Sequence, residues 1–449
     1  MAKRPSRAQE RQRLFDAAAH VQVPGDCDVI VVGGGAAGLV AAITAAEAGA
    51  EVLVLDRDLE CGRPILATGN GRCNFSNVNL DPKRFNDPQF VGAVCGDRWL
   101  DDILAFFRES GLRWCLEDER LYPMSRSSAS VRNVLLARAK KAGVILAPAR
   151  EVVGIDRIDT TRPGSPERRK RQEVGVEALG MSVEVACTEP SSNYPVLPNA
   201  QAVVIASGGE ALPALLDVGL VTARRTPVLC PVACDAPFLS QLDGRRAHAQ
   251  AYLTKRGSFF PTWHERGEVL FRDYGLSGIV TFDLSRRVEA GDLVELDLAP
   301  DLTKSQVQQL VDPFASGSFE PGCLDGILDP QVVRVLEDLA CQCWHVEWAE
   351  RPMPETDAAA LIDLVKALPL VATGLADTNH AQVTRGGLLT EQFDPATLAS
   401  REHEWLFACG EALDVDADCG GFNLSWAWKS GMVAGASAAQ LALSRRGFA

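Results

Sequence analysis

The sequence lacks any long hydrophobic run. No stretch of about 18 apolar residues occurs in the 449-residue chain, so we expect no membrane-spanning helix. Residues 1–25 carry several basic side chains but no apolar core of the kind that a secretory signal peptide has. We therefore expect a cytoplasmic protein in which residues 1–25 form a tail or a short surface helix.

The residue patterns of dithiol and metal sites are also missing. The 13 cysteines include no Cys-x-x-Cys pair, which disfavours a reductase with two thiols beside its cofactor. The chain has 6 histidines, and its cysteines and histidines do not have the spacing of a four-ligand zinc site. We expect no metal, and we expect the scattered cysteines to be reduced thiols.

Positive charge is in deficit. Lysine and arginine total 45 against 59 aspartates and glutamates, which gives a formal net charge of −14. This balance is the opposite of the basic surface that nucleic-acid binding needs. We therefore expect no nucleic-acid partner, and a tRNA-modifying enzyme is disfavoured for the same reason.

What the sequence does contain is a glycine-rich turn between two short apolar runs. The runs, residues 29–32 and 52–55, predict buried parallel strands. The turn has the spacing G-x-G-x-x-G and leads into an alanine-rich helix, at Gly33, Gly35, Ala36, Ala37 and Gly38. Such glycines let the backbone approach a pyrophosphate, and the helix N-terminus offers it amide groups. Asp56 ends the second run, where an acid can accept ribose hydroxyls, so the pattern predicts dinucleotide binding.

The later segments suggest that the C-terminal part of the chain completes the sheet that begins at residue 29. The apolar run 202–206 ends at Ser207 and Gly208, which predicts a strand and a glycine turn at the ligand edge of a parallel sheet. Short strand-like runs follow, and then apolar residues at helical spacing over 302–370. No second G-x-G-x-x-G occurs, so we expect no separate nicotinamide-binding unit.

A second candidate ligand segment lies near the C-terminus. The apolar run 405–410 leads into Gly410 and Glu411, and a glycine pair follows at the start of a long predicted helix. Amide groups at such a helix start can hold the negative charge of a reduced flavin. The residues that would supply these groups are Gly421, Phe422, Asn423 and Leu424. The alternative is that Asn423 only caps the helix.

Five segments together resemble a known family. They are residues 62–74 (GRPILATGNGRCN), 121–125 (LYPMS), 275–278 (GLSG), 383–387 (VTRGG) and 410–423, which begins with GEALD and ends with GGFN. In this order they are similar to the BaiN-like family of FAD-dependent oxidoreductases, over about residues 28–440. Arg72 and Asn74 fit such a site chemically, because both can donate hydrogen bonds to phosphate or flavin oxygens.

The resemblance implies an α/β fold, a Rossmann-like FAD domain of the two-dinucleotide-binding type interrupted by a β-rich, barrel-like domain and a small helical domain. The expected ranges are 26–210 and 372–449 for the FAD domain, 211–300 for the β-rich insert and 301–371 for the helical insert. It also implies non-covalent FAD and NAD(P)H as a candidate electron donor. The implied FAD contacts are Gly33, Gly35, Ala36, Ala37, Gly38, Asp56, Arg57, Gly62, Gly71, Arg72, Cys73, Asn74, Val152, Ser207, Gly208, Gly410, Glu411, Asp414, Gly421, Phe422, Asn423 and Leu424.

The chain departs from the family pattern at several places. Pro64 stands where a basic residue is usual, Arg272 and Asp273 replace a Thr-His pair, Ile279 replaces a proline, and Phe422 replaces a tyrosine. The usual glycine-rich loop after residue 209 is missing. The cofactor segments are therefore kept, whereas the side expected to face the substrate is altered.

The resemblance implies hydride transfer through the flavin to an activated C=C bond of a steroid-like or other apolar enone. An acid must then protonate the α carbon, and the candidates, in order, are Tyr122, Tyr274 and Asp273. The competing interpretation of each tyrosine is a packing residue whose hydroxyl bonds to the backbone. Two other functions stay open: a flavin oxidase or dehydrogenase with another electron acceptor, and a flavin-binding redox sensor or partner-binding protein without catalysis.

Overall fold

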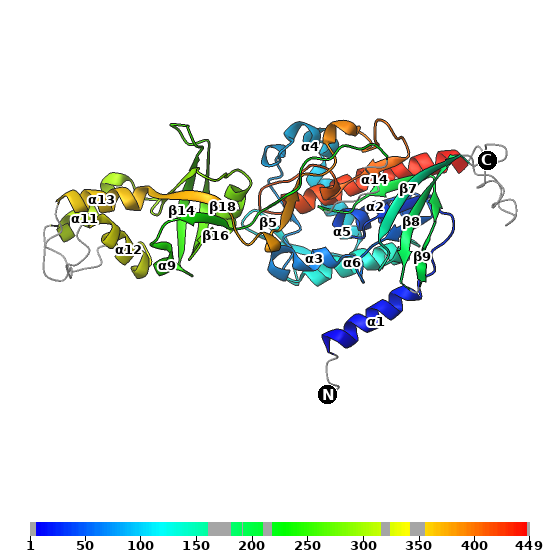
Figure 1. The fold of residues 1–449 in the computed structure, drawn as a ribbon, viewed down its shortest axis with the longest axis horizontal. Coiled ribbons are helices and arrows are strands. Elements are labelled where there is room, and N and C mark those ends of the chain that lie inside the picture. Colours follow the sequence, from blue (N-terminus) through cyan, green and yellow to red (C-terminus); the bar gives the residue numbers. More distant parts are fainter. Residues whose placement is uncertain are drawn as a thin grey trace. The chain divides into compact units, whose positions relative to one another are not determined.

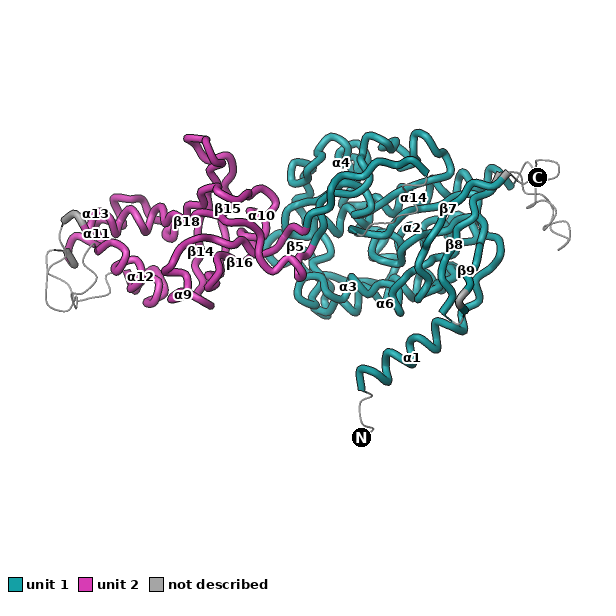
Figure 2. The backbone as a smooth tube through the Cα atoms, in the orientation of Figure 1, with its two compact units in different colours: residues 1–226, 383–449 teal, residues 227–382 magenta. Residues whose placement is uncertain are grey.

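The chain forms two compact units in the computed structural model, which describes residues 6–159, 181–190, 192–209, 218–315, 324–341 and 355–446. Unit 1 combines residues 1–226 with 383–449, and unit 2 is the continuous segment 227–382 (Figure 2). Unit 1 is thus assembled from two separated parts of the chain.

A five-stranded parallel sheet forms the centre of unit 1. Its order is β20-β11-β1-β2-β6. The strands are β1 (Val29–Val32), β2 (Val52–Leu55), β6 (Ile145–Ala147), β11 (Ala202–Ile205) and β20 (Leu406–Ala408). Strands β1, β2, β11 and β20 are buried along their whole length, as expected for strands covered on both faces. The predicted Rossmann-like sheet, completed by a strand from the C-terminal segment, is confirmed.

Helices α2 (Ala36–Glu47) and α14 (Phe422–Arg446) pack against each other beside this sheet (Figure 1). Small residues permit the close approach. A Cβ atom on Gly431 would lie 2.6 Å from the carbonyl oxygen of Ala37, and one on Gly435 would lie 2.8 Å from Ala41 Cα. The two glycines lie four residues apart and so share one face of α14.

Smaller elements complete unit 1. Two antiparallel sheets contain β3 (Ser76–Asn77), β4 (Trp114–Glu117) and β5 (Arg120–Pro123), and β7 (Val152–Asp159), β8 (Met181–Glu189), β9 (Ser192–Val196) and β10 (Asn199–Ala200). Among the described residues of unit 1, the other α-helices are α1 (Arg7–Ala19), α3 (Arg63–Ala67), α4 (Pro88–Cys95), α5 (Trp99–Glu109) and α6 (Ser128–Lys141). The 3₁₀ helices are η1 (Thr68–Gly71), η2 (Pro82–Arg84), η5 (Thr390–Gln392) and η6 (Gly410–Ala412).

The tail predicted for residues 1–25 contains helix α1. Ser6 caps it, since its hydroxyl accepts from the Gln9 amide at 3.3 Å and the Gln9 side chain accepts from the Ser6 amide at 2.9 Å. The Arg150 guanidinium donates to the carbonyl oxygen of Ala18, in the last turn of the helix, and to that of Val21, just after it. These contacts tie the end of α1 to the rest of unit 1.

Unit 2 is built around a closed antiparallel barrel. Its order is β13-β16-β15-β14-β17-β18. The strands are β13 (Val232–Asp235), β14 (Arg246–Thr254), β15 (Trp263–Arg272), β16 (Gly275–Ser277), β17 (Leu293–Asp297) and β18 (Leu368–Leu375). Closure leaves no free strand edge. The predicted barrel-like insert is confirmed.

The helices of unit 2 pack against one another and on the barrel. In the part of unit 2 that the structure describes they are α9 (Leu239–Leu242), α10 (Ile279–Ser285), α11 (Lys304–Ala315), α12 (Pro330–Ala340), α13 (Glu355–Lys366) and the 3₁₀ helix η4 (Thr378–His380). Val307, Leu336 and Leu361 on the longer helices join barrel residues in one buried apolar core.

The limits of the units differ from the expected ranges. The expected boundary after residue 371 falls within β18, which pairs with both β13 and β17 and so closes the barrel. The chain passes between the units near β12 (Thr226–Val228) and β19 (Val383–Arg385), which pair with each other. The structure also joins the β-rich and helical inserts in a single compact unit.

Candidate functional site

The glycine turn after β1 has the backbone shape that its sequence predicts. Gly33 has φ +105°, and a side chain there would clash with the carbonyl oxygen of Ala206 at the end of β11. A Cβ atom on Gly38 would clash with the carbonyl oxygen of Gly33. Gly35 precedes the first residue of α2, so the amides of this turn are presented at the carboxyl edge of the sheet.

Asp56 lies at the end of β2, beside this turn. Its carboxylate accepts the Gly34 amide at 2.9 Å and the Asp58 amide at 2.8 Å. Burial raises the pKa of Asp56 and the two amides oppose that shift. Each carboxylate oxygen keeps further acceptor capacity. The next residue, Arg57, is exposed.

The turn after β20 is brought to the same edge. Gly410 has φ +64°, and a Cβ atom there would lie 2.7 Å from the Cβ of Ala37 at the start of α2. Two side chains of α14 hold the turn: Ser430 Oγ accepts the Gly410 amide at 2.9 Å, and Trp426 Nε1 donates to the Gly410 oxygen at 3.0 Å. The two separated glycine motifs therefore meet at the start of α2.

Glu411 is held next to Gly410 by backbone amides. The Gly209 and Thr384 amides donate hydrogen bonds to its carboxylate. Burial, with the nearby charge of Asp416, nevertheless raises the pKa of Glu411 to about 7. Glu411 thus connects the end of β11 with β19, and at neutral pH it can accept or donate a proton.

The loop from Gly69 to Asn74 contacts the start of α14. The Asn74 amide nitrogen donates to the Ser76 oxygen at 2.9 Å, and its amide oxygen accepts the Gly421 amide at 3.1 Å. The Asn74 side chain thus has partners within the chain, and its contact with a cofactor stays a prediction. It joins the two most specific family segments, about 350 residues apart in sequence.

Asn423 also bonds within the chain. It is the second residue of α14, and its side chain both accepts from and donates to the backbone of Ala417, at 2.8 and 2.9 Å. It therefore holds the preceding loop rather than capping its own helix. The first-turn amides of Phe422, Asn423 and Leu424 have no acceptor within the helix, as in any α-helix.

Tyr122 is flanked by two guanidinium groups. Its ring is buried, with Arg72 Cζ 4.5 Å and Arg126 Cζ 5.7 Å from the ring centroid. Glu117 pairs with both arginines, at 2.5 and 2.7 Å, which fixes them about the ring. No hydrogen bond to the Tyr122 hydroxyl occurs among the described residues, so the bond to the backbone considered for it is not seen. Arg126 also contacts the Cys115 thiol on the neighbouring strand.

Cys73 lies in the same loop as Arg72 and is fully buried, with φ +55°. Burial raises the pKa of its thiol to about 11, opposed by a hydrogen bond with Thr68. A buried neutral thiol fits the packing role expected for Cys73 better than a nucleophilic one.

The other predicted cofactor residues lie at several places in unit 1. Asp414 Oδ1 accepts the Gly386 amide at 3.0 Å, and burial raises the pKa of Asp414. Val152 begins β7, where it pairs with Cys187. The remaining predicted cofactor residues are three glycines with positive φ, Gly62, Gly71 and Gly208.

One buried polar atom at this edge has no partner. Ser207 follows Ala206 after β11, and its Oγ is buried without a hydrogen-bond partner among the described residues. Unpaired buried hydroxyls are rare in folded proteins and point to an absent ligand. Together with the glycine cradle at Gly33, Gly38 and Gly410, this orphaned hydroxyl shows that the edge fits an extended polar cofactor such as FAD.

The two other candidate proton donors belong to unit 2. Asp273 is exposed in the turn between β15 and β16. Tyr274 is half-buried with Arg272 Cζ 5.6 Å from its ring centroid, and burial raises its pKa. Tyr122 is thus the candidate that unit 1 itself provides.

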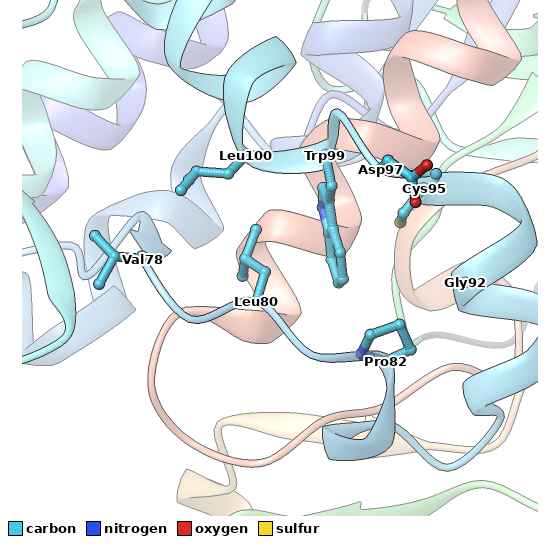
Figure 3. A pocket seen from close by; sticks show the side chains of 9 residues that line it. Val78, Leu80, Pro82, Gly92, Cys95, Asp97, Trp99 and Leu100 are labelled. Carbon is cyan, nitrogen blue, oxygen red and sulfur yellow. The ribbon is translucent and has the colours of Figure 1, made fainter.

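A cavity of about 360 Å³ lies elsewhere in unit 1, with Trp99 among its lining side chains (Figure 3). Its lining comprises Val78, Leu80, Pro82, Gly92, Cys95, Gly96, Asp97, Trp99 and Leu100. None of these is a predicted site residue. Among the described residues, no cluster of three or more metal-binding side chains occurs, and no helix has the length and apolar character to cross a membrane.

Sequence reasoning missed the residues that hold the site together. Ser430 and Trp426 lie four residues apart on the face of α14 that meets Gly410. Arg385 makes a two-bond ion pair, at 2.9 and 3.0 Å, with the fully buried Asp416. For Ser430 and Trp426, the signal available in the sequence was the presence of hydrogen-bonding side chains within the alanine- and glycine-rich stretch of α14.

Sequence comparisons connect almost the whole chain to known proteins. The family model described as HI0933-like protein Rossmann domain matches residues 27–437. The chain is 30% identical over 438 residues to 3-dehydro-bile acid delta(4,6)-reductase of Clostridium scindens, covering 91% of this chain and 98% of that protein. It is 25% identical over 421 residues to ribosomal RNA dihydrouridine synthase of Escherichia coli, covering 90% and 96%.

Solved structures show more distant likenesses. The chain matches a 3-ketosteroid-delta4-(5alpha)-dehydrogenase from Rhodococcus jostii with a TM-score of 0.45 and 15% identity, over 94% of this chain and 99% of that one. It matches a flavocytochrome c3 fumarate reductase with a TM-score of 0.47 and 13% identity, over 98% and 82%. Scores this low support no statement about the activity of this chain.

Proposed function

We propose that this chain, which belongs to the HI0933-like family of Rossmann-domain proteins and is an FAD-dependent oxidoreductase, reduces a carbon–carbon double bond conjugated to a carbonyl group. The observation that carries the proposal is the match of 91% of the chain to 98% of a relative named 3-dehydro-bile acid delta(4,6)-reductase. The proposed substrate is a steroid-like or other apolar enone, and the proposed electron donor is NADH or NADPH.

The residues along the carboxyl edge of the sheet support one direction for the bound FAD, with its ADP half and its flavin half on different sides of β1. Asp56 and the glycine turn after β1 would hold its ADP half, because they combine a ribose acceptor with phosphate-binding amides. Ser207, Glu411 and the start of α14 would hold its flavin half on the β11–β20 side. When bound, FAD supplies a hydride carrier.

Tyr122 is the proposed proton donor. Hydride addition to the β carbon of an enone leaves an enolate, which needs a proton at the α carbon to give the saturated ketone. A phenol is a neutral donor at pH 7. Arg72, Arg126 and Glu117 fix the Tyr122 ring, and its hydroxyl has no protein hydrogen bond among the described residues.

The activity is tested on the purified holoprotein. We expect a flavin absorption spectrum, rapid anaerobic bleaching by NADH or NADPH, and reoxidation by a 3-oxo-4-ene steroid that gains two hydrogens, read by mass spectrometry. Flavin reduced by a substrate and reoxidised only by oxygen would instead support the oxidase or dehydrogenase. Bound FAD without turnover on an enone panel would support the redox sensor.

Tyr122→Phe tests the proton donor. We expect kcat for enone reduction to fall about 100-fold or more, with FAD affinity unchanged, because the ring remains and only the acid is lost. Tyr194→Phe is the matched control, since Tyr194 is 80% exposed on β9. Equal rates for Tyr122→Phe and the wild type would remove Tyr122 from the mechanism.

Uridine reduction in ribosomal RNA is a second candidate function. It is favoured by the match over 90% of the chain to a relative named ribosomal RNA dihydrouridine synthase. The 5,6 double bond of uracil is conjugated to a carbonyl group, so the reaction class is the same, whereas the net charge of −14 opposes RNA binding. Mass spectrometry of ribosomal RNA nucleosides from a deletion strain tests it, since loss of dihydrouridine that complementation restores would support this function.

A further inference from the structure

Arg225 is a partly buried arginine without a partner among the described residues. Its Nη1 atom is buried and donates to no hydrogen-bond acceptor among the described residues. Burial lowers the pKa of its guanidinium, and no neighbouring carboxylate opposes that shift. The side chain as a whole is only partly buried, and Nη1 is the atom that lacks an acceptor. A buried donor without an acceptor is rare in a folded protein and calls for a ligand.

The backbone around Arg225 packs against the glycine pair of the VTRGG segment. A Cβ atom on Gly386 would lie 3.0 Å from Arg225 Cα, and the Ala223 amide donates to the Gly387 oxygen at 2.7 Å. The Gly386 amide in turn donates to Asp414 Oδ1 at 3.0 Å. The segment before β12 thus runs beside the segment that follows Gly410, within unit 1.

This position belongs to the flavin side of the proposed cofactor site. Glu411 and Asp414 follow β20, and Glu411 also accepts the amide of Gly209 after β11. Asp56 lies on the opposite side of β1, at the end of β2. The glycine turn and α2 would neutralise the pyrophosphate of FAD, and the amides at the start of α14 would hold the charge that the flavin gains on reduction. These contacts leave Arg225 available for an anion from another molecule.

We propose that Arg225 binds an anionic oxygen of the substrate at the flavin side of the site. The proposal rests on the proposed function for the identity of the site. A carboxylate is the ligand that suits a guanidinium best, because two oxygens can take two parallel N–H groups. The other source is the carbonyl oxygen of the enone, which gains negative charge when hydride adds.

Small-molecule probes distinguish a carboxylate from the enone oxygen as the group that Arg225 binds. Benzoate and benzamide differ in charge but not in shape, and cyclohex-2-enone carries only the enone. Each is titrated into the oxidised holoprotein and followed by calorimetry and by the flavin difference spectrum. In the wild type we expect benzoate to bind more tightly than benzamide. In Arg225→Gln we expect benzoate affinity to fall about tenfold or more, while benzamide affinity stays the same.

Three controls accompany this variant. Arg224→Gln removes the neighbouring exposed arginine and should leave every affinity unchanged. Arg225→Lys keeps the charge and should restore part of the benzoate affinity. The melting temperature of Arg225→Gln should be no lower than that of the wild type, because the Arg225 side chain makes no hydrogen bond or ion pair among the described residues.

The outcomes decide between distinct readings. A loss of cyclohexenone affinity alone in Arg225→Gln would assign Arg225 to the enone oxygen and support the proposal in that form. Unchanged affinities for all three probes, or a wild type that binds none of them, would overturn it. Loss of FAD with a lower melting temperature would make Arg225 structural. Arg225-dependent benzoate binding without reduction of any enone would keep the anion site while contradicting the proposed function.

Discussion

At the residue scale, the buried polar groups of the described chain are of two kinds. Asp416 is fully buried, but Arg385 compensates its charge with two hydrogen bonds. Ser207 Oγ, Arg225 Nη1 and Glu337 Oε1 are buried without a hydrogen-bond partner among the described residues. The first two lie toward the proposed ligand edge of unit 1, where a bound molecule would satisfy them, whereas Glu337 lies in α12 of unit 2.

Glu337 makes stability depend on pH. Burial, with the charges of Asp325 and Asp338, raises its pKa from the ordinary value of 4.5 to about 7. Between these values the folded chain keeps a proton that the unfolded chain releases, so the free energy of unfolding falls as pH rises from 4.5 to about 7. Below 4.5 both states hold the proton, and the group then contributes nothing.

Glu337→Gln should remove this dependence. Its free energy of unfolding, relative to the wild type, should increase between pH 4.5 and pH 8 by up to about 3 kcal/mol. Urea unfolding of both proteins at the two pH values measures the difference. Asp312→Asn, at an exposed position of α11, is the control and should change it little, because Asp312 is not among the charges that act on Glu337. A constant difference across the pH range would contradict the assignment.

At the element scale, the buried face of α14 makes two kinds of contact, one that needs small residues and one that needs hydrogen-bonding side chains. Gly431 and Gly435 let it approach the backbone of α2, while Trp426 and Ser430 bond to the Gly410 turn. The buried face of α14 therefore carries small and polar residues rather than a simple apolar stripe. The position of the Gly410 turn depends on how closely α14 packs on α2.

Gly435→Ala tests that close approach. The new Cβ atom would clash with the carbonyl oxygen of Ala41 and lie 2.8 Å from Ala41 Cα, and backbone atoms in a helix cannot yield. We expect a loss of about 2–3 kcal/mol in the free energy of unfolding, although alanine favours a helix more than glycine does. Chemical denaturation measures it, with Ala436→Ser on the exposed face as the control. Unchanged or higher stability would show that the helices can move apart at little cost.

At the scale of the whole molecule, each unit has its own buried apolar core. Unit 2 is one continuous segment with a closed barrel, whereas unit 1 needs β20 and α14 from the end of the chain. The Leu229 oxygen accepts the Gln382 amide at 3.3 Å, so the chain enters and leaves unit 2 at neighbouring positions. We therefore expect that unit 2 can be removed without disrupting the fold of unit 1.

We expect a chain in which Asn-Gly replaces residues 230–381 to fold and to bind FAD. The two-residue turn suits the short gap between Leu229 and Gln382. The flavin spectrum and a cooperative thermal transition are the measurements, and isolated residues 227–382 should fold but remain colourless. A shortened chain that is colourless despite added FAD would place part of the cofactor site in unit 2.

The glycine turn and its strands could be predicted from the sequence because they depend on neighbours in the chain. Residues 29–32 and Gly33 specify a buried strand and a positive-φ turn through side-chain size and backbone sterics alone. The limits of the inserts could not be placed, because β18 is a strand only through its pairing with β13 and β17. The Asn74 side chain likewise took a partner, Gly421, that no local pattern identifies.

The sequence by itself determined the Rossmann-like sheet, since that depends on short-range periodicity and on glycines whose conformations few other residues adopt. The family and its barrel-like insert followed from the resemblance of five sequence segments. The tertiary structure decided which polar groups are satisfied within the chain. Asn74 and Asn423 are used by the fold, whereas Ser207 and Arg225 are left without partners among the described residues. That distinction depends on contacts between segments hundreds of residues apart, which spacing along the chain does not encode.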